Sequence, residues 1–229
     1  MRATSKLLAL ALTAALQPAF AGVVSLNFED VTVASDPDGL GMFQLGDRYK
    51  NLGVQFSGAA WGVTSLKCDG FSLFVPHDNG CSALMLAGDP RDGTIESGKT
   101  FTMNFADGFA SGSSFFYTAL TSSKLSITLF DGLDGKGNSI SVSALDKLAV
   151  ADCDVVGARL CNWFALTMDF TGTAKSMVVS GNDETVMLDD IKLVQASTNP
   201  GRLPEPASLA LSIGALGALG WARKRAAAR

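Results

Sequence analysis

Two pairs of neighbouring acids, which lie near the two ends of the strand-rich body of the chain, could hold a cation. Glu29 and Asp30 follow the apolar run that starts at Val23, and Asp189 and Asp190 interrupt an alternating apolar run. That alternation predicts that one of the two later acids points towards a core. A buried carboxylate is costly unless it has a partner or a metal ion. The alternative is that all four are solvated acids at strand ends.

Catalytic chemistry has little support in the sequence. The chain has one histidine, His77, within the turn-like run Pro76-His77-Asp78-Asn79-Gly80, which predicts an exposed loop residue. No nucleophile elbow, metalloprotease, phosphate-loop or dinucleotide motif is present. We therefore predict that the protein is not an enzyme. A glycan-acting hydrolase with two catalytic carboxylates is the alternative, because the chain is rich in acids.

Aromatic side chains offer a third kind of chemistry, the binding of sugar rings. Trp61 lies among small residues in Gly58-Ala-Ala-Trp-Gly62, as if displayed, and it is the predicted ligand platform. Further candidates are Trp163, Phe115, Phe116 and Tyr117. Because side chains alternate along a strand, Phe115 and Tyr117 must point away from Phe116. The alternative for all of these residues is a place in the core.

The four cysteines are Cys68, Cys81, Cys153 and Cys161, an even number that predicts disulfides in an exported protein. Three pairings are possible, and we favour the two local bridges, Cys68–Cys81 and Cys153–Cys161. A zinc site is the alternative, but the chain has no C-x-x-C pair and a single histidine.

Short alternating runs separated by turn residues predict an all-β fold, an antiparallel β-sandwich or jelly roll. In Lys99–Phe105 the alternation puts Phe101, Met103 and Phe105 on one face. The segment from Asp131 to Asn138 predicts a hairpin turn rather than a calcium loop. The last three runs predict two consecutive hairpins. The predicted strands are 23–28, 53–57, 71–75, 84–86, 99–105, 113–119, 124–130, 139–145, 163–170, 174–180 and 185–194.

This pattern is similar to that of jelly-roll carbohydrate-binding modules. Such modules often hold a structural calcium ion where the first and last strands meet. The resemblance implies that Glu29 and Asp189, with Asp30 or Asp190 and backbone carbonyls, bind Ca²⁺ through oxygen ligands.

Both ends of the chain are targeting segments by sequence. Residues 1–21 combine Arg2 and Lys6, an apolar run and Ala19-Phe20-Ala21, which predicts a secretory signal peptide cleaved before Gly22. At the other end, an uncharged run predicts a membrane span over residues 207–222. Basic residues follow it and should stay on the cytoplasmic side.

That C-terminal segment, residues 203–229, resembles the PEP-CTERM sorting signal of exported Gram-negative bacterial proteins, which is also labelled an ice-binding protein C-terminal domain. The resemblance rests on the motif residues before and after the span, namely Pro204, Glu205, Pro206, Arg223, Lys224 and Arg225. It implies recognition by an exosortase, removal of the tail, and transfer of the body from the inner membrane to the cell envelope or beyond. The resemblance also implies an association with exopolysaccharide or biofilm matrix.

The remaining body is a predicted β-sandwich domain, residues 22–195, joined to the tail by a linker, residues 196–202. The terminal segments contain six of the 18 basic residues and one of the 22 acidic residues, so the body and linker together, residues 22–202, carry a net charge of −9. Such a surface repels nucleic acid and anionic lipid. We therefore expect a structural or polysaccharide-binding module without nucleic-acid partners.

Overall fold

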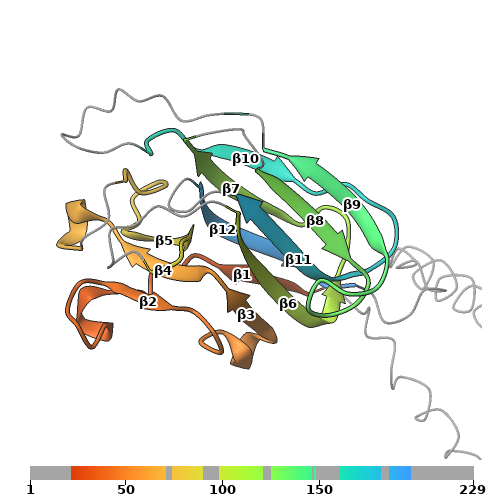
Figure 1. Cartoon of the computed structure of the whole chain (residues 1–229), viewed down its shortest axis with the longest axis horizontal. Coiled ribbons are helices and arrows are strands. Elements are labelled where there is room, and N and C mark those ends of the chain that lie inside the picture. The colour runs from red at the N-terminus through yellow and green to blue at the C-terminus, as the bar shows by residue number, and fades with distance from the viewer. Residues whose placement is uncertain are drawn as a thin grey trace, which may run out of the picture. The chain divides into compact units, whose positions relative to one another are not determined.

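The computed structural model describes residues 22–70, 74–89, 98–120, 125–145, 147, 160–181 and 186–196. These residues form two antiparallel β-sheets (Figure 1). The seven-stranded sheet contains β1 (Val23–Leu26), β2 (Met42–Gln44), β4 (Ala60–Thr64), β5 (Ser82–Leu86), β7 (Ser114–Ala119), β10 (Phe164–Thr167) and β12 (Val186–Val194). The five-stranded sheet contains β3 (Val54–Gly58), β6 (Lys99–Phe109), β8 (Ser126–Phe130), β9 (Ser139–Ala144) and β11 (Ala174–Gly181). Three short 3₁₀ helices lie in the connections, η1 (Val33–Ser35), η2 (Lys50–Leu52) and η3 (Leu66–Cys68).

The five-stranded sheet has the order β3-β6-β11-β8-β9 and the alternation expected of a sheet with one buried face. On β6, Phe101, Met103 and Phe105 are all buried in the main core, as the sequence predicted. Buried residues of the seven-stranded sheet, among them Leu188 and Ile191, belong to the same core. The two sheets therefore share one apolar interior.

The seven-stranded sheet has the order β10-β7-β12-β5-β4-β2, with β1 paired to β12 as well. β1 and β5 both pair with β12, one after the other along its length. Leu26 of β1 pairs with Ile191, and Leu84 of β5 pairs with Leu188. This sheet also carries a second apolar cluster, which includes Trp61, Met85, Met187, Phe74 and Leu160. A parallel bridge between Phe74 and Leu160 joins two segments outside the strands that contribute to this cluster.

The structure corrects the sequence prediction at three places. Strands β2 and β4 were not predicted. The predicted strand 71–75 is represented by the Phe74 bridge, and residues 71–73 lie outside the described part. The two C-terminal hairpins are wrong, because β10, β11 and β12 alternate between the sheets and do not pair with one another. The hairpin across residues 131–138 is confirmed by the pairing of β8 with β9.

Within the described residues, no helix has the length and apolarity needed to cross a membrane. The predicted signal peptide, residues 1–21, lies outside the described part, as do the predicted span 207–222 and the whole sorting segment 203–229. Of the predicted linker, Ala196 is described, and its backbone N–H donates to the carbonyl of Gly108.

Candidate functional site

A β-bulge in β12 brings Asp189 and Asp190 together. Asp189 pairs with Phe116 and Lys192 pairs with Ser114, so β12 uses three residue steps where β7 uses two. Asp190 takes up the extra residue with a φ of 47°. Because Leu188 and Ile191 on either side both enter the main core, the bulge keeps both acids out of it.

A third acid reaches the same place from the end of β1. The Glu29 carboxylate accepts hydrogen bonds from the backbone N–H of Cys81 at 3.0 and 2.9 Å, one to each oxygen, and from Ser82 N–H at 3.2 Å. Cys81 and Ser82 stand at the start of β5. Glu29 therefore connects the end of β1 to the start of β5, at the point where β5 replaces β1 as the partner of β12.

His77 lies in the loop that precedes Cys81 and contacts the bulge of β12. Its Nδ1 lies 3.0 Å from an Asp190 oxygen and 3.4 Å from an Asp78 oxygen. Its ring stacks on Phe116 with centroids 3.9 Å apart and meets Trp163 edge-on at 5.7 Å. The side chain is only 12% exposed, so the prediction of an exposed loop histidine is wrong.

The electrostatics of this cluster are dominated by negative charge. The pKa of Asp189 is raised to about 8, mainly by burial and in smaller part by the neighbouring carboxylates of Asp190, Glu29 and Asp78. A hydrogen bond from the Asp190 backbone N–H to Asp189 Oδ1, 2.7 Å long, works in the opposite direction. In the described part of the chain, no lysine or arginine pairs with any of these four carboxylates.

Asp30, the remaining acid of the predicted cation site, belongs to a different contact. Its carboxylate accepts from Arg48 Nε at 2.6 Å and from the Tyr49 hydroxyl at 2.5 Å. Burial, together with this hydrogen bond, raises the pKa of Tyr49. The structure thus brings Glu29, Asp189 and Asp190 together, adds His77 and Asp78, and removes Asp30 from the set.

The loop that carries His77 is covalently closed. Cys68 and Cys81 form a disulfide, which confirms one predicted bridge. Cys161 is also disulfide-bonded, and Cys153, its predicted partner, lies outside the described residues. The ring from Cys68 to Cys81 places the His77 segment against β12.

Trp61 is not a displayed ligand platform. It is 4% exposed, belongs to the second apolar cluster, and donates its indole N–H to the carbonyl of Gly88 at 2.5 Å. The predicted opposition on β7 is confirmed, because Phe115 and Tyr117 enter the main core while Phe116 meets His77. Trp163 is partly buried and donates to the carbonyl of Val75.

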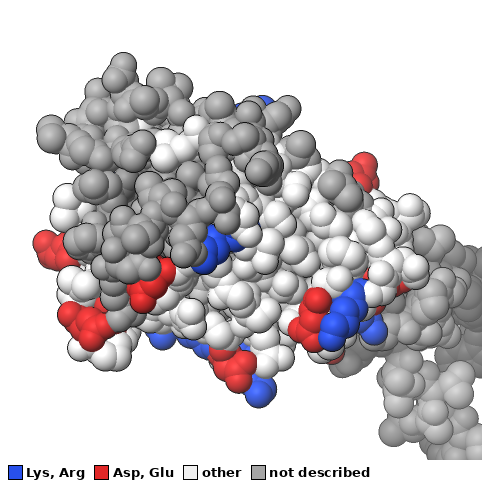
Figure 2. Space-filling model, in the orientation of Figure 1, with Lys and Arg blue, Asp and Glu red and all other residues white. Residues whose placement is uncertain are grey.

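The outer face of the five-stranded sheet is a second candidate surface, and it is built from small uncharged side chains. Cross-strand pairing places Ser57 beside Thr102, Thr102 beside Val178, and Val178 beside Thr128. The next row contains Thr100, Ser180 and Ser126. These residues are exposed or half-buried, because their strand neighbours point into the core. Figure 2 shows a broad area without charged side chains in the region of β8 and β9.

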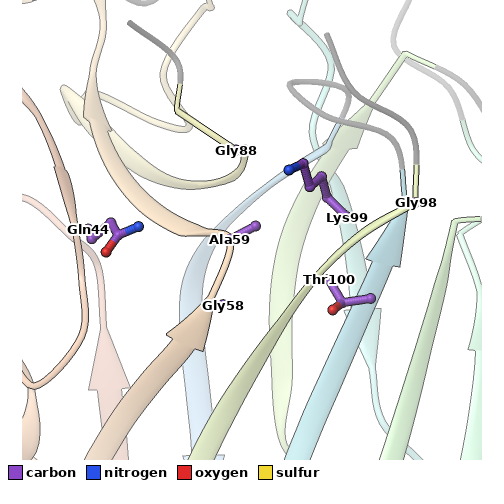
Figure 3. A pocket seen from close by; sticks show the side chains of 7 residues that line it. All are labelled: Gln44, Gly58, Ala59, Gly88, Gly98, Lys99 and Thr100. Carbon is purple, nitrogen blue, oxygen red and sulfur yellow. The ribbon is translucent and has the colours of Figure 1, made fainter. Parts of the chain in front are cut away.

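An open pocket of about 400 Å³ lies at the edge of this face. It is lined by Gln44, Gly58, Ala59, Gly88, Gly98, Lys99 and Thr100. In Figure 3, Gln44 lies on one side of the Gly58–Ala59 corner, and Lys99 and Thr100 lie on the other. Gly58 has a φ of 74°, and a Cβ there would lie 2.6 Å from the Thr100 carbonyl oxygen, so only glycine fits this close approach. Thr100 belongs to both the pocket and the hydroxyl rows.

No protein-family model matches the chain, and no curated protein matches it. Several solved structures are similar. The cleaved adhesin domain K1 of Lys-gingipain from Porphyromonas gingivalis W83 has 11% identity and a TM-score of 0.45, over 77% of this chain and 99% of that one. The carbohydrate-binding module TmCBM61, in complex with β-1,4-galactotriose, has 13% identity and a TM-score of 0.40, over 74% and 94%. The mannan-recognising module TmCBM27 has 11% identity and a TM-score of 0.33, over 77% and 100%. Likenesses at this level concern the course of the chain and not its ligand.

Proposed function

We propose that the body is a non-catalytic module that binds a neutral polysaccharide through the outer face of the five-stranded sheet and the pocket beside it. The observation that carries this proposal is the double row of hydroxyl side chains on that face. A hydroxyl group both donates and accepts hydrogen bonds, as the hydroxyls of a sugar do. The threonine methyls and Val178 supply apolar contacts between the polar groups.

The charge of the protein determines which class of polysaccharide it can bind. None of the seven residues in the two rows carries a charge, and the body and linker together carry a net charge of −9. Polyanions such as nucleic acids or uronic-acid polymers would be repelled at low ionic strength. A neutral chain pays no such cost. The ligand class is therefore an uncharged polysaccharide such as a glucan, galactan or mannan.

The sorting signal completes the proposal. The signal peptide at residues 1–21 would export the chain, and an exosortase would recognise the motif around Glu205 and remove the tail. The body would then reach the cell envelope or the surrounding matrix, where polysaccharide is present. Intact mass spectrometry of the protein from cells that contain the sorting enzyme tests this. Recovery of stable protein that still ends at Arg229 would contradict it.

Binding is tested by affinity electrophoresis of the purified protein in gels that contain one neutral polysaccharide each, with an alginate gel as the anionic comparison. The double variant Thr102→Val with Thr128→Val removes two hydroxyls and retains the side-chain shape. We expect it to weaken binding at least tenfold. Thr167→Val, an exposed threonine of the other sheet, is the matched control and should bind normally.

The same experiment separates binding from hydrolysis. Retention in the gel without release of reducing ends supports a binding module. Release of reducing ends that is lost on substitution of an acid would support the alternative, a hydrolase. Unchanged retention of the double variant would remove the hydroxyl face from the proposal.

A further inference from the structure

The cluster of His77, Asp78 and Asp190 has the composition of a metal centre. One atom from each residue, the imidazole Nδ1 and two carboxylate oxygens, lies within 4.8 Å of the others. Nδ1 is 3.0 Å from the Asp190 oxygen and 3.4 Å from the Asp78 oxygen. With bonds of about 2.0–2.2 Å, two ligand atoms of a tetrahedral ion lie about 3.4 Å apart. The three side chains therefore need only small movements to share one ion.

A separate observation indicates that a positive charge belongs here. Asp189 is 3% exposed. Among the described residues, its carboxylate accepts one hydrogen bond, from the Asp190 backbone N–H to Oδ1. Its other oxygen, Oδ2, accepts no hydrogen bond from the described residues. Asp189 also pairs with Phe116, the residue on which His77 stacks, so its side chain and His77 lie over the same face of the sheet. A carboxylate of a buried residue, with one oxygen that has no donor among the described residues, thus lies close enough to Asp190 and Asp78 to interact with their charges.

The imidazole decides which kind of ion fits. Calcium prefers six to eight oxygen ligands, whereas an imidazole with carboxylates is a typical ligand set for zinc and related first-row metals. The oxygens of Glu29 already accept three hydrogen bonds from two backbone N–H groups, which leaves them less available as additional ligands. The His77 ring is held between Phe116 and Trp163, so its nitrogen is positioned before any ion binds.

We infer that His77 Nδ1 and the carboxylates of Asp78 and Asp190 bind one Zn²⁺ ion in preference to Ca²⁺, with the Asp189 side chain beside the site. The ion uses the tautomer of His77 with its proton on Nε2. Asp78 is 76% exposed, so water completes the coordination. The ion fastens the loop closed by the Cys68–Cys81 disulfide to the bulge of β12 and has a structural role. The ligand set replaces the calcium ligands expected from the sequence.

The test is isothermal titration of the purified full chain with Zn²⁺ or Ca²⁺, after treatment with EDTA and removal of the chelator. We expect one Zn²⁺ per chain, bound at least tenfold more tightly than Ca²⁺, and a higher melting temperature with Zn²⁺. His77→Phe keeps an aromatic ring against Phe116 and removes the nitrogen ligand. It should weaken Zn²⁺ binding at least tenfold.

Asp190→Asn should have a similar effect, and Asp69→Asn is the matched control. Asp69 is an exposed acid of the same disulfide-closed loop and has a φ of 64°, which asparagine tolerates. The control should bind Zn²⁺ as the natural chain does. Tighter binding of Ca²⁺ than Zn²⁺, or Zn²⁺ binding that survives both His77→Phe and Asp190→Asn, would overturn the inference.

Discussion

The backbone N–H of Cys81 donates to both oxygens of the Glu29 carboxylate, across 52 positions of sequence. This contact fixes the place where β1 ends and β5 begins beside β12. It also puts the closing residue of the disulfide loop next to the acids of the β12 bulge. The alignment of two strands and the position of the His77 loop therefore depend on one side chain.

Replacement of Glu29 by glutamine should destabilise the protein. An amide offers one carbonyl oxygen, and its NH₂ group faces backbone donors that it cannot satisfy. Loss of bonds to a charged acceptor costs about 1.5–3 kcal/mol, and the hydrogen bonds that the amide oxygen still accepts offset part of this. We expect the free energy of unfolding in urea to fall by about 1–2 kcal/mol. Asp69→Asn should change it little, and an equal loss in both variants would contradict the role of Glu29.

Asp189 should make the metal-free protein less stable as the pH rises. Its pKa is about 8 in the folded chain and about 3.9 in the unfolded chain. Between these values the unfolded chain has lost the proton and the folded chain keeps it, so stability falls by up to about 1.4 kcal/mol per pH unit from this group. Below pH 4 and well above pH 8 the contribution is constant.

The measurement is urea unfolding of the natural chain and of Asp189→Asn in EDTA from pH 5 to pH 8. The variant should gain stability relative to the natural chain as the pH rises. The other titratable groups that face Asp189 are Glu29, His77, Asp78 and Asp190, and they are present in both proteins. Their contributions largely cancel in the difference. Two curves that stay parallel across this range would show that Asp189 keeps an ordinary pKa.

The strands that the sequence predicted well have one buried face. On β6, Phe101, Met103 and Phe105 alternate with polar residues, and this periodicity is visible without a structure. On β4, all five residues from Ala60 to Thr64 are buried, because the second apolar cluster covers the other face of the sheet. Such a strand has no alternation to detect. The same cover explains why Trp61, among small residues, is buried.

The candidate metal site could be predicted only in part. Two adjacent acids between Leu188 and Ile191 break the alternation of β12, and this break is the sequence signal of the bulge. The approach of His77 has no such signal, because the contact with Asp190 spans 113 positions and depends on the fold of the disulfide loop. Asp30, the alternative to Asp190 in the predicted set, pairs with Arg48 instead, a contact that its adjacency to Glu29 in the sequence does not indicate.

Removal of the Cys68–Cys81 bridge should lower stability and also weaken the proposed zinc site. The bridge closes a loop of 13 positions, for which loop-closure entropy corresponds to about 3 kcal/mol. Unfolding of the double variant Cys68→Ser with Cys81→Ser measures the first effect, and titration with Zn²⁺ measures the second. A folded variant with unchanged Zn²⁺ affinity would show that the ring does not position His77.

Thr118 provides a prediction that depends on packing alone. It is fully buried, and its hydroxyl has no hydrogen-bond partner, which makes it the one such side-chain group in the described part of the chain. Burial of an unpaired hydroxyl costs roughly 1–3 kcal/mol. Thr118→Val should therefore raise the free energy of unfolding by about 1 kcal/mol, measured in urea. Thr64→Val is the matched comparison, because the buried Thr64 hydroxyl donates to the Val31 carbonyl at 3.0 Å. That variant should lose about 1 kcal/mol, since it removes one of the two hydroxyl donors to the buried Val31 carbonyl, the other being Ser82. If both substitutions shift stability in the same direction, hydrogen-bond satisfaction does not govern these two positions.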